Sequence, residues 1–225
     1  NKLRKKIDFE LEALYLDLGM KECTNKRTEA IVKKLCKQMG VKLNILRMKE
    51  VVEKKIEEVA KKRRRPICSV CGVVKRYLMN RYAREHGFNK LATGHNADDI
   101  LRFFFKNWMS GNLDWIAKLK PVVPSTHPKL VTRIRPLFEC TEMENYAYAS
   151  IRGFNFISRC SYMLRKDKWR EILEFIEKKR RGFKISFVKN LEKLEMKITQ
   201  EKLRECDVCG EPTNLKICSF CKMFR

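Results

Sequence analysis

The stretch that decides the fold is Phe9-Glu10-Leu11-Glu12-Ala13-Leu14-Tyr15-Leu16. It is apolar and partly alternating, as is typical of a β-strand. The segment after it predicts a helix that is capped by Thr24 and ends at Gly40, with apolar residues recurring on one face. Residues 41–46 then form a second predicted strand. The stretch therefore opens a strand-helix-strand unit.

Helices and strands continue to alternate along the chain. Further helices are predicted over residues 51–62, 73–85, 142–152 and 167–179, and short strands over residues 90–93, 133–137 and 154–157. Strands that are separated by helices usually pair in parallel, and the helices then cover the sheet. The sequence therefore predicts an α/β fold with a parallel sheet.

The charge of the chain points to a polyanionic partner. It has 51 Lys and Arg against 27 Asp and Glu, a formal net charge of +24, and the run Lys61-Lys62-Arg63-Arg64-Arg65 is entirely basic. Nucleic acid explains this excess better than a solubilising surface does. No segment approaches the roughly 18 consecutive apolar residues of a membrane-spanning helix, so we expect no membrane partner.

The cysteines indicate metal binding in a reducing cytoplasm. There are ten of them, and four form two tight pairs near the C-terminus: Cys206, Cys209, Cys218 and Cys221. Four thiolates at this spacing close a tetrahedral zinc site, and so short a segment has too little core to fold without one. Two roles remain open for this knuckle: a structural one, and docking to nucleic acid.

A third cysteine pair, Cys68 and Cys71, cannot close a metal site alone. The candidates for a third ligand are Cys160, Cys140, His86 and His95. Cys160 is favoured because the loops at the carboxyl ends of parallel strands converge on one crevice. The spacing of these cysteines leaves three alternatives open for the site: an iron-sulfur cluster, a zinc site and a redox pair. The other cysteines, Cys23 and Cys36 among them, are interpreted as ordinary partly buried thiols.

The motif Gly94-His95-Asn96-Ala97-Asp98-Asp99 follows a predicted buried strand. A glycine turn lets the backbone approach a ligand, Asn96 can cap the next helix, and paired carboxylates can contact Mg²⁺ or act as a general base. The alternative is an ordinary helix N-terminus, where Asn and Asp are favoured by capping and the helix dipole.

Taken together, several motifs resemble one enzyme family. They are Pro66 to Tyr77 (PICSVCGVVKRY), Ala92 to Asp99 (ATGHNADD), Arg135-Pro136-Leu137, Cys160 and the terminal cysteine pairs. This combination resembles the tRNA 2-thiolation enzymes of the ATP-pyrophosphatase (PP-loop) superfamily, which act on wobble or T-loop uridines. The resemblance runs from about Phe9 to the end, and it implies an adenine nucleotide alpha hydrolase-like domain.

The resemblance also implies a reaction and its cofactors. ATP with Mg²⁺ would adenylate the C2 oxygen of a tRNA uridine, and sulfur from a separate donor would then replace AMP. Cys68, Cys71 and Cys160 would hold a 4Fe-4S cluster with one open iron. Asp99 would serve as acid/base or metal-orienting carboxylate. The remaining implied site residues are Gly94, His95 and Asn96 at the nucleotide, and Lys75 and Arg76 at ATP phosphates or tRNA.

Two departures from the family pattern are visible. The phosphate-binding motif SGGxDS and an N-terminal zinc knuckle do not occur in these residues, and we expect both upstream of Asn1. After Cys160, the stretch Ser161-Tyr162-Met163-Leu164-Arg165 replaces a small-residue, Gly-Ala-containing stretch. We divide the chain into a PP-loop-type domain (1–165), a basic helical extension (166–204) and a zinc module (205–225).

Two other functions remain as alternatives: a non-catalytic, zinc-dependent RNA-binding protein and a cytidine-thiolating relative. The first leaves the GHNADD motif without a task, and members of the second generally lack the terminal double CxxC. We expect a cytoplasmic tRNA-uridine 2-sulfurtransferase, a homodimer by resemblance. The abundant Lys and Ile residues slightly favour the wobble uridine as its target.

Overall fold

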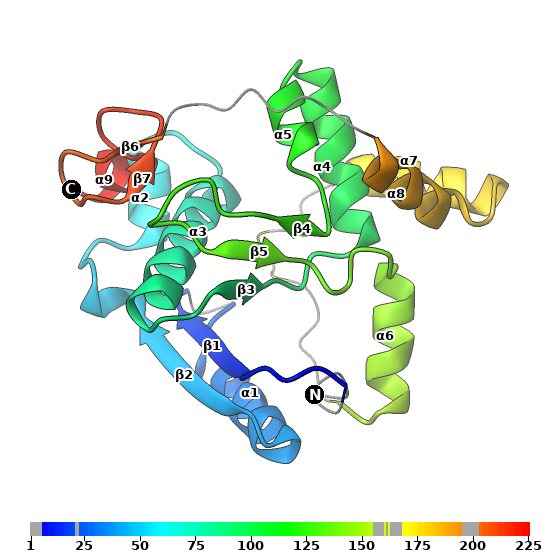
Figure 1. Ribbon diagram of the computed structural model, residues 1–225, viewed down its shortest axis with the longest axis horizontal. Coiled ribbons are helices and arrows are strands. Elements are labelled where there is room, and N and C mark those ends of the chain that lie inside the picture. Colours follow the sequence, from blue (N-terminus) through cyan, green and yellow to red (C-terminus); the bar gives the residue numbers. More distant parts are fainter. Residues whose placement is uncertain (1–5, 21–22, 155–159, 161, 163–167, 195–202) are drawn as a thin grey trace.

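The structure is a computed structural model that describes residues 6–20, 23–154, 160, 162, 168–194 and 203–225 (Figure 1). It opens with the predicted strand-helix-strand unit: β1 (Glu12–Asp17), α1 (Lys26–Met39) and β2 (Lys42–Arg47). The two strands pair in parallel over their whole length. This part of the prediction is confirmed.

The cap of α1 differs from the prediction by one residue. The side chain of Asn25, not of Thr24, accepts the backbone N–H of Thr28, at 3.0 Å. Thr24 Oγ1 instead accepts the backbone N–H groups of Leu18 and Met20 at 3.1 and 3.2 Å. Thr24 therefore closes the loop after β1, and both residue types suit a cap equally well.

The second sheet has the order β3-β5-β4, with β3 (Lys90–Ala92) parallel to β5 (Thr132–Ile134). The short strand β4 (Val122–Val123) is antiparallel to β5 and was not predicted. Among the described residues, β1 and β2 form a sheet separate from β3, β5 and β4. Parallel pairing between strands that are distant in sequence holds in both sheets, as the fold class requires.

Several helices lie between these strands in the sequence. They are the 3₁₀ turn η2 (Met48–Glu50) and the helices α2 (Ile56–Lys62), α3 (Ile67–Glu85), α4 (Ala97–Met109) and α5 (Leu113–Ala117), and α6 (Glu142–Ile151) follows β5. None of the described helices is both long and apolar enough to cross a bilayer. Of the predicted strand over residues 154–157, residues 155–157 lie outside the described part of the chain.

Two hydrophobic cores support the fold. The first surrounds α2 and α3 and contains fully buried residues from both helices, with Ile56, Val70 and Val74 each 0 % exposed. The second surrounds α4, where Ile100 and Leu101 are also 0 % exposed. Each core is completed by residues from the last third of the chain, described next.

The next described residues after Tyr162 form two helices, α7 (Lys168–Lys179) and α8 (Phe183–Lys193). Both pack on α4 (Figure 1) and add Leu173, Val188 and Leu191 to the second core. Helix α7 was predicted, whereas α8 lies in the predicted basic helical extension but was not assigned as a separate helix. Its basic residues mask an apolar spacing, and Glu177 supplies its cap by accepting the backbone N–H of Lys184 at 2.9 Å.

A buried carboxylate connects these helices. Asp98 on α4 accepts the ammonium group of Lys184 (α8) through Oδ1 at 2.6 Å, and the backbone N–H of Glu142 (α6) through Oδ2 at 2.7 Å. Lys184 also binds Glu174 of α7 at 2.6 Å. The Asp98 and Lys184 side chains are only 10 % and 3 % exposed, so neither charge is solvated by bulk water.

The last segment folds as a small knuckle of β6 (Arg204–Glu205), β7 (Pro212–Thr213) and α9 (Ser219–Phe224), with an antiparallel β6-β7 pair. It lies against α2 and α3 (Figure 1). Its cysteines Cys206, Cys218 and Cys221 belong to the first core, so this segment is packed into the body of the protein.

We predict that Lys184→Met destabilises the fold by about 3–5 kcal/mol, because it leaves the Asp98 carboxylate buried without its cation. Urea unfolding measures this. The matched control is Lys189→Met on the same helix, whose pair with Glu139 is exposed and 3.7 Å long; its effect should stay below about 1 kcal/mol. Equal losses in the two variants would contradict the prediction.

Candidate functional site

The cysteine pair of the CSVC motif lies in the first turn of α3, which begins at Ile67 rather than at Val73. Cys68 is exposed and Cys71 is half-buried. Burial raises the pKa of the Cys71 thiol, and the ammonium group of Lys75, one turn along α3, opposes this shift. The pair therefore stands at a helix start with a cation beside it, although burial of Cys71 outweighs the effect of that cation on its pKa.

The segment that contains Cys160 lies beside this pair. Cys68 Sγ is 3.6 Å from the backbone oxygen of Tyr162, whose hydroxyl contacts Glu57 Oε1 of α2 at 3.5 Å. Convergence of Cys160 on the CSVC motif was expected from the topology. Chain segments 94 residues apart thus meet at the start of α3.

Cys160 itself is paired with Cys23 in a disulfide, with the two Cα atoms 5.4 Å apart. Cys23, at the exit of β1, was interpreted from the sequence as an ordinary partly buried thiol, and that interpretation is wrong. Because only a thiolate ligates iron, Cys160 can serve as a cluster ligand only after this bond is reduced.

The GHNADD motif forms the start of α4, and its two carboxylates have different tasks. Asn96 caps the helix as predicted: its side chain accepts the N–H of Asp99 at 3.0 Å, and Asp99 Oδ2 accepts the N–H of Asn96 at 3.3 Å. Asp99 also pairs with Arg102 and stays partly exposed. Asp98 is buried in the helix contacts described above, so Asp99 is the carboxylate that a substrate can reach.

Open space surrounds the turn before this helix. A Cβ atom added at Gly94 would meet nothing within 4 Å. His95 Nδ1 lies 2.8 Å from Thr93 Oγ1. Burial lowers the pKa of His95, and three nearby arginines add to this while Asp99 opposes it, so the imidazole is neutral at pH 7.

Those arginines, Arg76, Arg133 and Arg135, form an arginine cluster between the two motifs. Burial lowers the pKa of each, and the charge of Arg133 lowers the pKa values of Arg76 and Arg135 further. Arg135 donates to the backbone oxygen of Lys118 at 3.2 Å. Among the described residues, the side chains of Arg76 and Arg133 make no hydrogen bond or ion pair, so the cluster is suited to bind an anion such as phosphate.

Arg76 was predicted as a phosphate ligand from the sequence, whereas Arg133 and Arg135 were not. The alternation Arg133-Ile134-Arg135 was the available signal, since residues i and i+2 of a strand share one face. Of the predicted run Arg63-Arg64-Arg65, Arg63 donates to the backbone oxygen of Lys222 at 2.5 Å and so holds the knuckle. Arg64 and Arg65 are exposed.

The four cysteines of the knuckle converge as predicted. Their sulfur atoms all lie within 4.8 Å of one another: Cys206, Cys209, Cys218 and Cys221. Burial raises the pKa of Cys206, but backbone N–H groups of Cys218, Val208 and Cys209 outweigh this and lower it to about 6. Four close sulfurs with a stabilised thiolate among them fit a tetrahedral zinc ion.

The comparisons with known proteins agree with this geometry. The PP-loop domain family matches residues 1–163. The chain belongs to this family. A tRNA-5-methyluridine(54) 2-sulfurtransferase of Pyrococcus horikoshii is 37 % identical to this chain, covering 98 % of this chain and 72 % of its own length. The enzyme of the same name from Thermotoga maritima is 32 % identical, covering 97 % of this chain and 74 % of its own length.

A solved structure is similar over nearly the whole chain. The U34-tRNA thiolase NcsA from Methanococcus maripaludis, with its [4Fe-4S] cluster, gives a TM-score of 0.79 at 26 % identity, covering 99 % of this chain and 73 % of that one. The resemblance to the tRNA 2-thiolation enzymes and the predicted PP-loop fold are therefore confirmed.

We predict that Cys160 of the folded wild-type chain is protected from iodoacetamide until a reductant is added, because its sulfur is bonded to Cys23. In Cys23→Ser, Cys160 should be alkylated without a reductant. Peptide mapping by mass spectrometry measures both. Cys36→Ser, which removes a free thiol of α1, is the control and should leave Cys160 protected. Equal alkylation of Cys160 in wild type and Cys23→Ser would contradict the pairing.

Proposed function

We propose that this protein is a tRNA-uridine 2-sulfurtransferase. The observation that carries the proposal is the 37 % identity, over 98 % of the chain, to a tRNA sulfurtransferase. The juxtaposition of a nucleotide-type turn, an arginine cluster and a cysteine pair supports it. The net charge of +24 suits a tRNA substrate.

In the proposed reaction, the uridine C2 oxygen attacks the α-phosphorus of ATP, and pyrophosphate leaves. Sulfur from the donor then forms a bond to C2, and the C2–oxygen bond breaks with AMP as the leaving group. Gly94, His95 and Asn96 would line the nucleotide, and the backbone at Gly94 is open to a ligand, since a Cβ atom there would meet nothing within 4 Å. The neutral imidazole of His95 adds no charge there, so the arginine cluster and Lys75 offset the phosphate charge.

Asp99 is the proposed acid/base or Mg²⁺-orienting carboxylate. Its capping bond to Asn96 and its pair with Arg102 fix its rotamer at the start of α4. A carboxylate that is held in this way needs no reorganisation when substrate binds. Asp98 does not compete for this role, since its side chain is only 10 % exposed and is paired with the buried ammonium group of Lys184, whereas the side chain of Asp99 is 25 % exposed.

Cys68, Cys71 and reduced Cys160 would hold the 4Fe-4S cluster, as the cluster-containing thiolase supports. Such a cluster supplies an iron that can bind sulfur when only three thiolates ligate it. The protein's own contribution would be to carry Cys68 and Cys71 on α3 with Lys75 one turn further along, and to supply Cys160 from a segment that meets Cys68 at Tyr162. The zinc ion would be held by the knuckle, whose packing against α3 favours the structural role over docking.

The position of the modified uridine is the finer part of the proposal. The abundance of Lys and Ile slightly favours the wobble position, and the cluster-containing thiolase acts on U34. The relatives named for position 54 share higher identity, 37 % and 32 %. Thionucleoside analysis of tRNA fragments from a deletion strain, read at both positions, decides between them. A separate sulfur donor, a homodimer and a cytoplasmic location complete the proposal.

We predict that Asp99→Asn lowers thiolation of tRNA by about 100-fold or more, since it removes the carboxylate charge and proton acceptor while keeping a capping oxygen. Thionucleoside formation measures the rate, and a filter-binding assay should show unchanged tRNA affinity. The control is Asp114→Asn in the first turn of α5, which should retain activity. Full activity of Asp99→Asn would remove Asp99 from the mechanism.

We predict that Cys160→Ala, purified anaerobically with reductant, loses its iron and acid-labile sulfide, because two thiolates alone hold a cluster poorly. Cys140→Ala should keep both, since Cys140 lies at the start of α6 and is not a proposed ligand. Wild-type iron content in Cys160→Ala would remove Cys160 as a ligand. A colourless wild-type protein that binds zinc and tRNA would instead support RNA binding without catalysis.

A further inference from the structure

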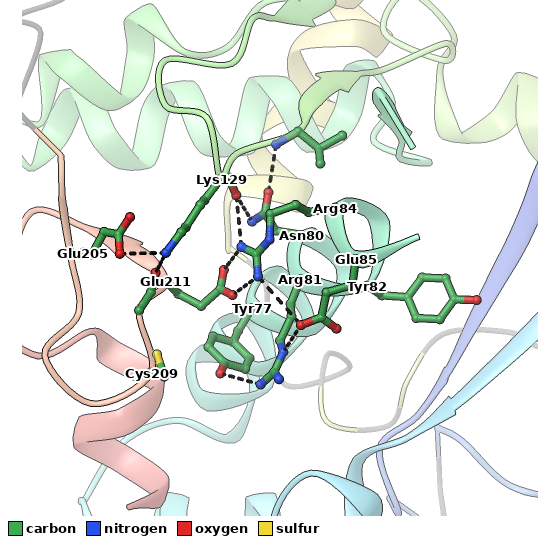
Figure 2. A network of polar contacts seen from close by, with 12 residues as sticks. Tyr77, Asn80, Arg81, Tyr82, Arg84, Glu85, Lys129, Glu205, Cys209 and Glu211 are labelled. Carbon is green, nitrogen blue, oxygen red and sulfur yellow. Dashed lines mark hydrogen bonds and ion pairs between the residues drawn. The ribbon is translucent and has the colours of Figure 1, made fainter. Parts of the chain in front are cut away.

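The start of strand β5 is fixed by a side chain of helix α3. Asn80 of α3 donates from Nδ2 to the backbone oxygen of Lys129 at 2.8 Å, and its Oδ1 accepts the backbone N–H of Val131 at 3.0 Å (Figure 2). One amide group thus binds a backbone acceptor and a backbone donor of the same loop, as a neighbouring strand would. Val131 immediately precedes β5, so this contact sets where the strand begins.

A second side chain of α3, that of Arg84, joins this contact and connects it to the knuckle. Its guanidinium donates to the same Lys129 oxygen at 3.3 Å and binds the buried carboxylate of Glu211 at 2.5 and 2.8 Å. The ammonium group of Lys129 binds Glu205 at 2.6 Å and the backbone oxygen of Gly210 at 3.1 Å. Lys129 is therefore held through its backbone by α3 and through its side chain by the knuckle (Figure 2).

Strand β5 leads directly into the proposed active site. Arg133, a member of the arginine cluster, is the second residue of the strand. The backbone oxygen of the next residue, Ile134, accepts the N–H of Thr93 at 3.0 Å. Thr93 directly precedes Gly94 of the GHNADD motif. The position of β5 therefore fixes both an arginine of the cluster and the turn at which this motif begins.

The proposed site needs α3 and β5 in a fixed relative position, because both elements contribute cations to it. Lys75 and Arg76 lie on α3, and Arg133 lies on β5. A guanidinium group binds phosphate strongly only when its donors meet the phosphate oxygens in the right geometry. An arginine whose strand can shift relative to the other cations loses part of that contact.

We infer that Asn80, supported by Arg84, is a positioning residue of the proposed site. It holds the start of β5 against α3, so that Arg133 and Arg76 reach the phosphate groups of one nucleotide together. The inference rests on the proposed function, in which the arginine cluster offsets phosphate charge. Loss of the Asn80 amide leaves every proposed ligand in the chain, frees the start of β5 and weakens nucleotide binding.

The first test compares the ATP affinity of Asn80→Ala and Asn107→Ala, measured by isothermal titration calorimetry. Asn80→Ala removes both bonds to the loop, so ATP affinity should fall about tenfold, as for one impaired charge-assisted contact. Asn107 is the matched control, because its amide donates within its own helix, to the backbone oxygen of Phe103 at 2.7 Å. Asn107→Ala should bind ATP as the wild type does. An unchanged affinity in Asn80→Ala would overturn the inference.

A double-mutant cycle separates positioning from a general loss of stability. Arg133→Gln removes the arginine through which Asn80 is inferred to act, so adding Asn80→Ala to it should weaken ATP binding no further. Additive losses would overturn the inference, because they would show an effect that does not pass through Arg133. In thiolation assays, Asn80→Ala should raise the KM for ATP, whereas a smaller folded fraction would lower only the apparent kcat.

Asn80→Asp keeps the inference testable if Asn80→Ala does not fold. Aspartate retains an oxygen for the N–H of Val131 and removes the donor to Lys129, whose oxygen Arg84 still reaches. Its ATP affinity should fall about threefold, and an unchanged affinity would overturn the inference. A wild type that binds ATP without thiolating tRNA would overturn the proposed function instead, while weaker ATP binding by the Asn80 variants would still support the positioning role.

Discussion

The architecture depends on one buried carboxylate, that of Asp98. It holds the ammonium group of α8 and the N-terminus of α6 at the same time, and the lysine it binds reaches α7 as well. The neighbouring residue, Asp99, is thereby presented on a helix whose start cannot shift. Two adjacent acidic residues thus differ in their surroundings: the carboxylate of Asp98 is buried in the scaffold, and that of Asp99 stays partly exposed at the start of α4.

The two halves of the site rest on different cores. The CSVC helix belongs to the core that the knuckle completes, and the GHNADD helix belongs to the core that α7 and α8 complete. The arginine cluster lies where the two motifs meet, with Arg76 from α3 and the other two members from β5 and the residue after it. The C-terminal third of the chain therefore supports both motifs, although it carries neither of them.

Much of the fold and of the candidate site could be predicted from the sequence, because features formed by residues that are close in the sequence leave a clear local pattern. The strand-helix-strand unit, the Asn96 cap and the convergence of the four terminal cysteines follow from periodicity, capping chemistry and spacing. Helix α8 was not assigned separately because its lysines obscure the apolar spacing. Arg133 and Arg135 of the arginine cluster were missed because the cluster depends on the tertiary approach of two segments. The Cys23 pairing has no local signal, since its partner is 137 residues away.

The Cys23–Cys160 bond also has a thermodynamic consequence. A cross-link across 137 residues removes many conformations from the unfolded chain, which corresponds to about 5 kcal/mol of added stability on the chain-entropy estimate. Oxidation would therefore strengthen the fold while removing the free thiol of Cys160, and reduction would do the reverse. In this protein, resistance to unfolding and the availability of a thiol at Cys160 depend on the same sulfur atom.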